Sequence, residues 1–102
     1  MKKLFVSQPM KDLSDEEILK VRENAACAVA KSLGEPVLLL DSFFKGAPRE
    51  NRPLWFLGKS LQALSEADVA FFVDGWKTSR GCAIEHICAE EYGVKIIEGV
   101  QL

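Results

Sequence analysis

The sequence predicts an α/β fold built on a parallel sheet, and three observations support this prediction. Short apolar runs that suit buried strands alternate along the chain with longer segments of helical periodicity. The apolar runs are nearly continuous, as expected for parallel strands that are covered on both faces. Helix start and stop signals, including a capping motif and glycines, separate these segments.

The first half of the chain predicts a strand, a helix and a second strand. Residues 4–7 form an apolar run, and a loop broken by Pro9 follows it. Ser14 and Glu17 have the spacing of a capping box, so we expect the helix to start there and to end at Gly34. One apolar stripe runs along this helix: Ile18, Val21, Ala25, Val29 and Leu33. Residues 36–41 are the second expected strand.

The second half predicts two more helices and two more strands. Residues 42–53 resemble a loop, and both a functional lid and a plain surface excursion remain open for it. A helix is expected after Pro53, then a strand at residues 69–73. The third helix is expected over residues 79–93, and residues 94–100 supply the fourth strand. The expected core face of the third helix carries Ile84, Ile87, Cys88 and Tyr92.

This order of elements leaves few topologies, because crossover connections between parallel strands are right-handed. We expect one domain over residues 1–102, with a flavodoxin-like or Rossmann-like parallel sheet of about four strands. The first strand should lie inside the sheet, and helices should cover both faces.

Composition narrows the classes of partner. A net charge of −2 argues against a nucleic acid polymer, although a single nucleotide needs only a local anion pocket. No apolar run approaches the roughly 20 residues of a membrane span, and the first residues suit a buried strand better than a signal peptide. Three cysteines without a CxxC motif suggest a cytoplasmic protein without disulfides.

A ligand site is expected where the strands end, because parallel sheets bind ligands beyond their carboxyl edge. The turns place polar and small residues at this edge. This pattern predicts where a site lies but not which reaction it catalyses. The residues are Ser7, Gln8, Pro9, Met10, Asp41, Ser42, Asp74, Gly75, Trp76, Ser79, Arg80 and Gly81. Asp41 and Asp74 also suit turns or caps, and Trp76 could stack on a base or pack against its loop.

The third helix offers several kinds of site. Cys82 and His86 can share a helix face, but without further ligands they are a weak metal signal, and we expect no metal or cofactor. Cys82 suits a packing residue better than a nucleophile. Cys27 and Cys88 suit the core, and His86 suits a surface or interface position. By pattern alone, Glu85 is a glutamate that stabilises the start of the helix.

Three stretches of the chain resemble one known family. They are "LFVSQPM", "SDEEI" and "SEADVAFFVDGWKTSRGCAIEHICAEEYGVKII". The chain is similar in them to the nucleoside 2-deoxyribosyltransferase-like proteins, which include a group of short bacterial and phage proteins. The resemblance implies that Glu85 attacks the anomeric carbon of a nucleoside and forms a glycosyl ester, without a metal. It also implies that Ser7, Gln8, Pro9 and Met10 line the sugar pocket.

The same resemblance extends to other positions and to function. Asp68 matches an aspartate before the third strand, and Ser79, Arg80 and Gly81 match a turn that holds a sugar hydroxyl or a 5′-phosphate. We expect a transferase or hydrolase of nucleosides or deoxynucleotides. The alternative is a nucleotide-binding or sensing module that keeps the pocket without the chemistry. A homodimer or larger assembly is also expected, because it would bury Phe43, Phe44, Trp55 and Phe56.

Overall fold

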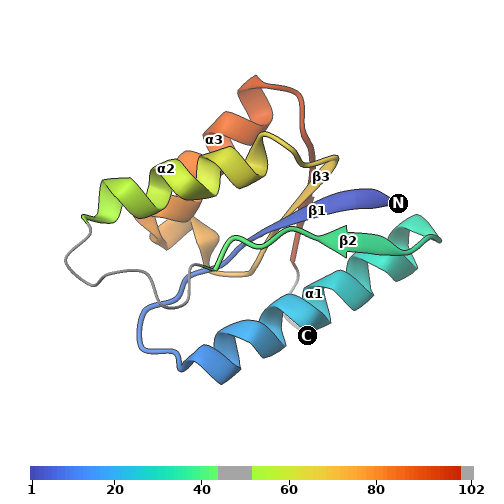
Figure 1. Ribbon diagram of the computed structural model, residues 1–102, viewed down its shortest axis with the longest axis horizontal. Coiled ribbons are helices and arrows are strands. Elements are labelled where there is room, and N and C mark those ends of the chain that lie inside the picture. Colours follow the sequence, from blue (N-terminus) through green and yellow to red (C-terminus); the bar gives the residue numbers. More distant parts are fainter. Residues whose placement is uncertain (44–51, 100–102) are drawn as a thin grey trace.

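The computed structural model describes residues 1–43 and 52–99 and has a parallel sheet at its centre (Figure 1). The four strands have the order β2-β1-β3-β4, which is the flavodoxin-like order with the first strand inside. Their bounds are Lys2–Ser7 (β1), Val37–Leu39 (β2), Val69–Phe72 (β3) and Lys95–Glu98 (β4). The predicted fold class is confirmed.

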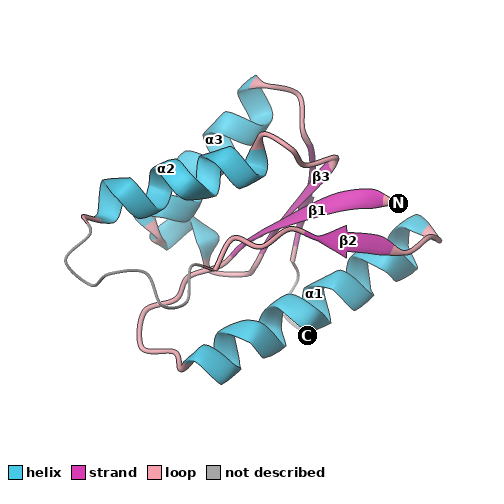
Figure 2. Cartoon of the chain, viewed as in Figure 1, coloured by secondary structure: helices cyan, strands magenta, loops and turns pink. Residues whose placement is uncertain are grey.

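Helices cover both faces of the sheet (Figure 2). Helix α1 (Asp15–Leu33) lies on one face, and α2 (Pro53–Leu64) lies with α3 (Arg80–Glu91) on the other. A short 3₁₀ helix, η1 (Trp76–Thr78), joins β3 to α3 and was not predicted. No helix within residues 1–43 and 52–99 is long and apolar enough to cross a membrane.

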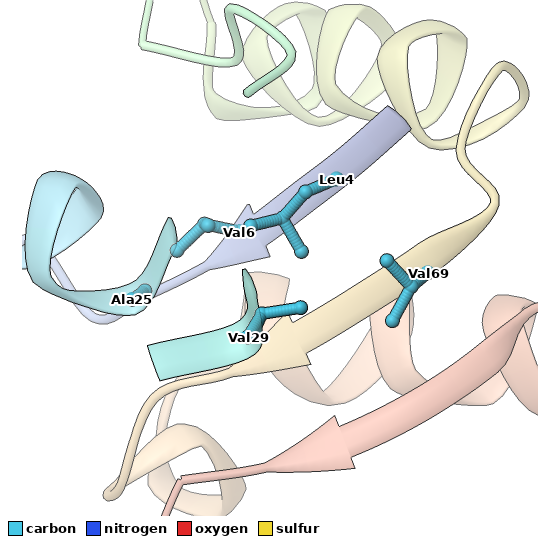
Figure 3. Packing of buried hydrophobic residues seen from close by; sticks show 5 residues of the cluster. All are labelled: Leu4, Val6, Ala25, Val29 and Val69. Atoms are coloured by element: carbon cyan, nitrogen blue, oxygen red, sulfur yellow. The ribbon is translucent and has the colours of Figure 1, made fainter. Parts of the chain in front are cut away.

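The core has two halves because consecutive side chains of a strand point to opposite faces. Leu4 and Val6 of β1 face α1, and Figure 3 shows them with Ala25, Val29 and Val69. Phe5, between them, faces α2 and α3. The buried members of the second half are Phe5, Leu64, Ala70, Phe72 and Ala89. The central strand β1 therefore links both halves of the core.

Helix α1 begins and ends as the sequence predicts. The Ser14 hydroxyl accepts from the Glu17 amide and the Glu17 carboxylate accepts from the Ser14 amide, both at 3.1 Å. Gly34 ends the helix with φ 71°, a backbone conformation that glycine adopts readily. The buried face differs from the expected stripe at two positions, since Arg22 is buried where Val21 was expected and Leu33 is only partly buried.

The last three strands are shorter than predicted. β2 covers three residues, and it lies at the edge of the sheet, where Leu38 is exposed. β3 ends at Phe72, and β4 spans Lys95–Glu98. The predicted loop at residues 42–53, for which a lid and a plain surface excursion were both open, falls mainly on residues 44–51. These residues, which include Phe44, lie outside the described residues, as does residue 100 of the fourth expected strand.

The predicted core face of α3 is wrong for two of its four residues, whereas Cys88 is partly buried and packs against the second half of the core. Tyr92 is 86% exposed and Ile87 is also exposed. The buried positions of the helix are Cys82, Glu85, His86 and Ala89, which have the spacing of one helix face. The apolar pattern misleads here because polar residues occupy that inward face. Cys27 is likewise exposed rather than in the core, because the buried stripe of α1 runs through Ala25 and Val29.

Candidate active site

Ser7 and Glu85 meet at the carboxyl edge of the sheet. Ser7 is the last residue of β1 and pairs with Phe72, the last residue of β3. Glu85 lies in the second turn of α3. The Ser7 Oγ donates a hydrogen bond of 2.6 Å to Glu85 Oε1, and the bond is buried. Glu85 is 7% exposed, so the carboxylate is held inside the protein by a hydroxyl.

Burial controls the charge of Glu85. Loss of hydration disfavours the charged carboxylate and raises the pKa of Glu85 above its ordinary value of 4.5. Hydrogen bonds from the Ser7 and Ser60 hydroxyls, and the positive charge of Arg22, oppose this increase in pKa. Three elements besides α3 therefore act on one carboxylate: β1 through Ser7, α2 through Ser60 and α1 through Arg22.

Arg22 reaches the site from the opposite face of the sheet. It is 4% exposed and donates from Nη1 to the Ser42 hydroxyl. The Ser42 hydroxyl donates in turn to the Val6 carbonyl at 3.4 Å. Burial lowers the pKa of Arg22, and the negative charges of Glu85 and Asp41 oppose this effect. We refer to Ser7, Arg22, Ser42, Cys82 and Glu85 as the polar cluster.

The sequence pattern did not indicate that Arg22 lies beside Glu85. One signal was available in the sequence. Arg22 follows Ile18 by four residues and precedes Ala25 by three, so it lies on the apolar stripe of α1. A charged residue in such a stripe must be buried with partners.

Cys82 completes the polar cluster as a packed thiol. Burial raises the pKa of Cys82, and hydrogen bonds with the Ser7 and Ser79 hydroxyls act in the opposite direction. The negative charge of Glu85 raises this pKa further. Because only the thiolate is a strong nucleophile, these effects favour the packing role expected for Cys82.

Two clefts lie near the carboxyl edge of the sheet, and residues of the polar cluster line the second of them. One, of about 610 Å³, lies between the starts of α2 and α3 and includes the expected residues Arg80 and Gly81. Its other lining residues are Arg52, Pro53, Leu54, Leu57 and Ile84. The second, of about 380 Å³, is lined by Arg22, Asp41 and Ser42 together with apolar side chains. Either volume suits a small organic ligand or a part of one.

The loop after β1 packs against the loop after β3. A Cβ atom on Gly75 would lie 3.8 Å from Pro9 Cγ, and Gly75 has φ 92°. Gln8 is buried, whereas Met10 and Asp74 are exposed. The structure therefore brings Ser7, Gln8, Pro9 and Gly75 to one edge, as the sequence predicts, with Met10 and Asp74 turned toward solvent.

Trp76 packs within the protein. Its ring stacks on His86 with centroids 3.9 Å apart and an angle of 5° between the planes. The Lys77 ammonium lies 5.7 Å from the same ring. Of the two roles considered for Trp76, this geometry favours packing over stacking on a base.

His86 is buried inside the chain, whereas the sequence pattern favoured a surface or interface position. Its Nδ1 lies 2.8 Å from Glu90 and its Nε2 lies 3.0 Å from Glu98. His86 therefore connects α3 with β4. Among residues 1–43 and 52–99, no three His, Cys, Asp or Glu side chains are grouped so that they could hold a metal ion.

Asp68 lies at the opposite edge of the sheet from Glu85. Its Oδ2 accepts a hydrogen bond of 2.8 Å from the amide of Lys3, near the start of β1. Asp68 precedes β3, and in a parallel sheet the residues before the strands gather at the amino edge. The structure therefore does not bring Asp68 to the site, although the resemblance implied a role there.

Comparisons of the chain with protein-family models, with curated proteins and with solved structures found no match.

The buried carboxylate has a consequence for stability that can be measured without any substrate. In the unfolded chain Glu85 ionises near the ordinary glutamate pKa, whereas the folded protein keeps the proton to higher pH. Between these two pKa values the unfolded state binds fewer protons, so the free energy of unfolding falls as pH rises. The loss is complete above the folded pKa and amounts to about 1.4 kcal/mol per unit of pKa elevation.

Glu85→Gln removes this titration, so its stability relative to the wild type should increase between acid and neutral pH. Denaturant unfolding at several pH values measures the difference. Glu91→Gln is the matched control, because Glu91 is exposed on the same helix. A stability difference for Glu85→Gln that stays constant with pH would contradict the raised pKa.

Proposed function

We propose that this protein cleaves the N-glycosidic bond of a nucleoside or deoxynucleotide with Glu85 as the nucleophile, and passes the sugar to water or to a second base. The observation that carries the proposal is the buried hydrogen bond between Ser7 and Glu85 at the carboxyl edge. It orients a carboxylate where α/β sheets bind ligands. The resemblance described above assigns the nucleophile to the same residue.

The reaction has two steps. A Glu85 oxygen attacks the anomeric carbon, the carbon–nitrogen bond breaks, and its electron pair leaves with the base. Water or a second base then attacks the same carbon, and the carboxylate leaves unchanged. The transition states have oxocarbenium character, so a carboxylate in a poorly hydrated site stabilises the positive charge that develops on the sugar. Ser7 holds Oε1 and so fixes the orientation of the attacking group.

The larger cleft supports a nucleotide as the ligand. Its volume of about 610 Å³ lies within the range of small-molecule sites. Arg52 and Arg80 both line it, and an arginine at the start of a helix suits a phosphate group. Gly81 lies one turn before Glu85, so this cleft approaches the helix on which the proposed nucleophile lies.

The proposal is tested by base release. The purified protein is incubated with a panel of deoxynucleosides and deoxynucleoside monophosphates, with and without a free acceptor base, and the products are separated by chromatography. Release that requires the acceptor indicates a transferase, and release without it indicates a hydrolase. A folded protein that releases no base from any substrate would favour the non-catalytic nucleotide-binding module, and a ligand-induced shift in melting temperature would then identify its ligand.

Ser7→Ala tests the role of the hydroxyl. The variant removes a hydrogen bond to the charged carboxylate, so the pKa of Glu85 should rise further. Because the nucleophile must be ionised, the acid limb of the pH–rate profile should move to higher pH, and the rate should recover partly in alkaline buffer. Exposed Ser65→Ala is the control. A rate that falls equally at every pH would show that Ser7 does not tune the carboxylate.

A further inference from the structure

Two buried polar side chains beside Glu85 have atoms without a hydrogen-bond partner. Gln8 is 4% exposed, and neither its Nε2 nor its Oε1 has a partner among the described residues. The Nε of Arg22 is buried and unpaired in the same way. Buried polar groups are nearly always paired, since an unpaired group loses its hydration without compensation. Such atoms at a ligand-binding edge indicate partners that a ligand supplies.

Gln8 and Arg22 belong to one end of the sheet. Gln8 directly follows Ser7, which holds Glu85. The guanidinium of Arg22 bonds to Ser42, whose hydroxyl reaches the Val6 carbonyl two residues before Gln8. Arg22 also lines the cleft of about 380 Å³ beside β2. Arg22 therefore borders a cleft, and Gln8 is connected to Arg22 through Ser42 and the end of β1.

The local charge argues against an anionic group at this position. The positive charge of Arg22 already faces the negative charges of Glu85 and Asp41. Asp41 lines the same cleft, so an oxyanion would meet two carboxylates for one guanidinium. A neutral group avoids this repulsion and still accepts a hydrogen bond from Arg22 Nε. The amide of Gln8, neutral itself, offers one donor side and one acceptor side.

We infer that Gln8 and Arg22 form a subsite for a neutral part of the ligand that offers both a donor and an acceptor. A sugar hydroxyl and the edge of a base share this chemistry. The inference rests on the proposed function and adds a property of the substrate to it: the end of the substrate at the α1 side of Glu85 is polar and uncharged.

Gln8→Met tests the subsite, because it keeps the length of the side chain and removes both hydrogen-bonding groups. Without ligand, the melting temperature should rise by roughly 4–8 °C, since unpaired buried polar groups are replaced by apolar ones. The affinity for deoxyadenosine, measured by titration calorimetry, should fall by about tenfold to a hundredfold. Arg22→Lys, which keeps the charge but removes Nε together with the Nη1 donor to Ser42, should weaken binding of the same ligand. Gln62→Met at an exposed position is the matched control.

Two analogues separate the possible sources of the neutral group. Purine 2′-deoxyriboside lacks the amino group of the base, and 2′,3′-dideoxyadenosine lacks the 3′-hydroxyl of the sugar. With Gln8 in place, the analogue that lacks the recognised group should bind more weakly than deoxyadenosine. With Gln8→Met, that analogue and deoxyadenosine should bind with equal affinity. The analogue for which this happens identifies the group that Gln8 binds.

Unchanged affinities in Gln8→Met overturn the inference, and so does a variant that melts earlier or fails to fold, because the amide then has a structural partner. Failure of the protein with native Gln8 to bind any of the three ligands overturns it as well. Each affinity is measured in the Glu85→Gln background, with Gln8 either native or replaced by Met, so that cleavage of the ligand contributes no heat. The inference and the proposed function can therefore fail separately. If Gln8→Met weakens binding but no base is released, the subsite is retained and the glycosidic cleavage is rejected. If base release requires Glu85 and is unchanged in Gln8→Met, the cleavage is retained and the subsite is rejected.

Discussion

Glu85→Gln should reduce base release by at least about a thousandfold, because an amide cannot form the glycosyl ester that the reaction requires. The substitution keeps the shape of the side chain and an oxygen that can accept from Ser7 Oγ. It also removes a buried charge, so the variant should fold at least as well at neutral pH. The loss therefore reflects chemistry rather than unfolding. Initial rates of base release, compared at equal concentrations of folded protein, give the measurement.

The control for this comparison changes the same chemical group elsewhere on α3. Glu91→Gln removes an equal charge at an exposed position and should leave base release within about twofold of the wild type, as expected for a surface substitution away from the site. Base release that survives in Glu85→Gln would reject the carboxylate as nucleophile. An equal loss in both variants would indicate a general effect of charge.

Phe5→Ala should destabilise the protein by about 3–5 kcal/mol. Phe5 is 1% exposed on the central strand β1 and packs against Leu64, Phe72 and Ala89 from β3 and the two helices of that face. Small domains have a free energy of unfolding of about 5–15 kcal/mol in total. The substitution should therefore remove a large share of the stability, as the midpoint of denaturant unfolding will show.

Tyr92→Ala is the matched aromatic control. Tyr92 is 86% exposed after the end of α3, so its truncation should change the free energy of unfolding by less than about 0.5 kcal/mol. The pair also tests the correction to the predicted core, which placed Tyr92 on the buried face. A comparable loss of stability in both variants would indicate that Tyr92 is buried, which contradicts the described packing.

Local signals were sufficient to predict the fold class. The capping box at Ser14 and the left-handed Gly34 are defined by residues close in sequence, and both bound α1 as expected. The apolar runs of β1 and β3 mark the interior of the sheet, and the crossover rule then limits the strand order. The edge strand β2 was predicted too long, because apolar runs do not distinguish an edge strand from an interior one.

The pairing at the site could not be read from local pattern. Ser7 and Glu85 are 78 positions apart, and only the fold brings them to one edge. The inward direction of Glu85 and His86 was hidden because apolar periodicity assigns such polar residues to the surface. The assignment of Glu85 as nucleophile came instead from the resemblance to a family, and it remains a prediction about chemistry.

The rule that ligands bind beyond the carboxyl ends of parallel strands names an edge of the sheet but does not select among its residues. Asp68 precedes β3 and accepts a hydrogen bond from Lys3 at the amino edge. A residue before its strand therefore does not belong to the carboxyl edge. Trp76 follows its strand, yet its ring packs on His86. Arg22 lies in a helix far from any strand end in sequence, and tertiary packing alone brings its charge close to Glu85.

The central claim is that the sugar becomes bonded to Glu85, and the most direct measurement is peptide mass spectrometry after an acid quench during turnover. Trypsin cleavage after Arg80 and Lys95 releases residues 81–95, which contain Glu85. This peptide should gain the mass of one sugar, fragmentation should place the sugar on Glu85, and the same peptide from Glu85→Gln should show no such gain. A sugar found on another residue would contradict the glycosyl ester at Glu85. Base release that proceeds equally in Glu85→Gln, with every peptide unmodified, would contradict it as well.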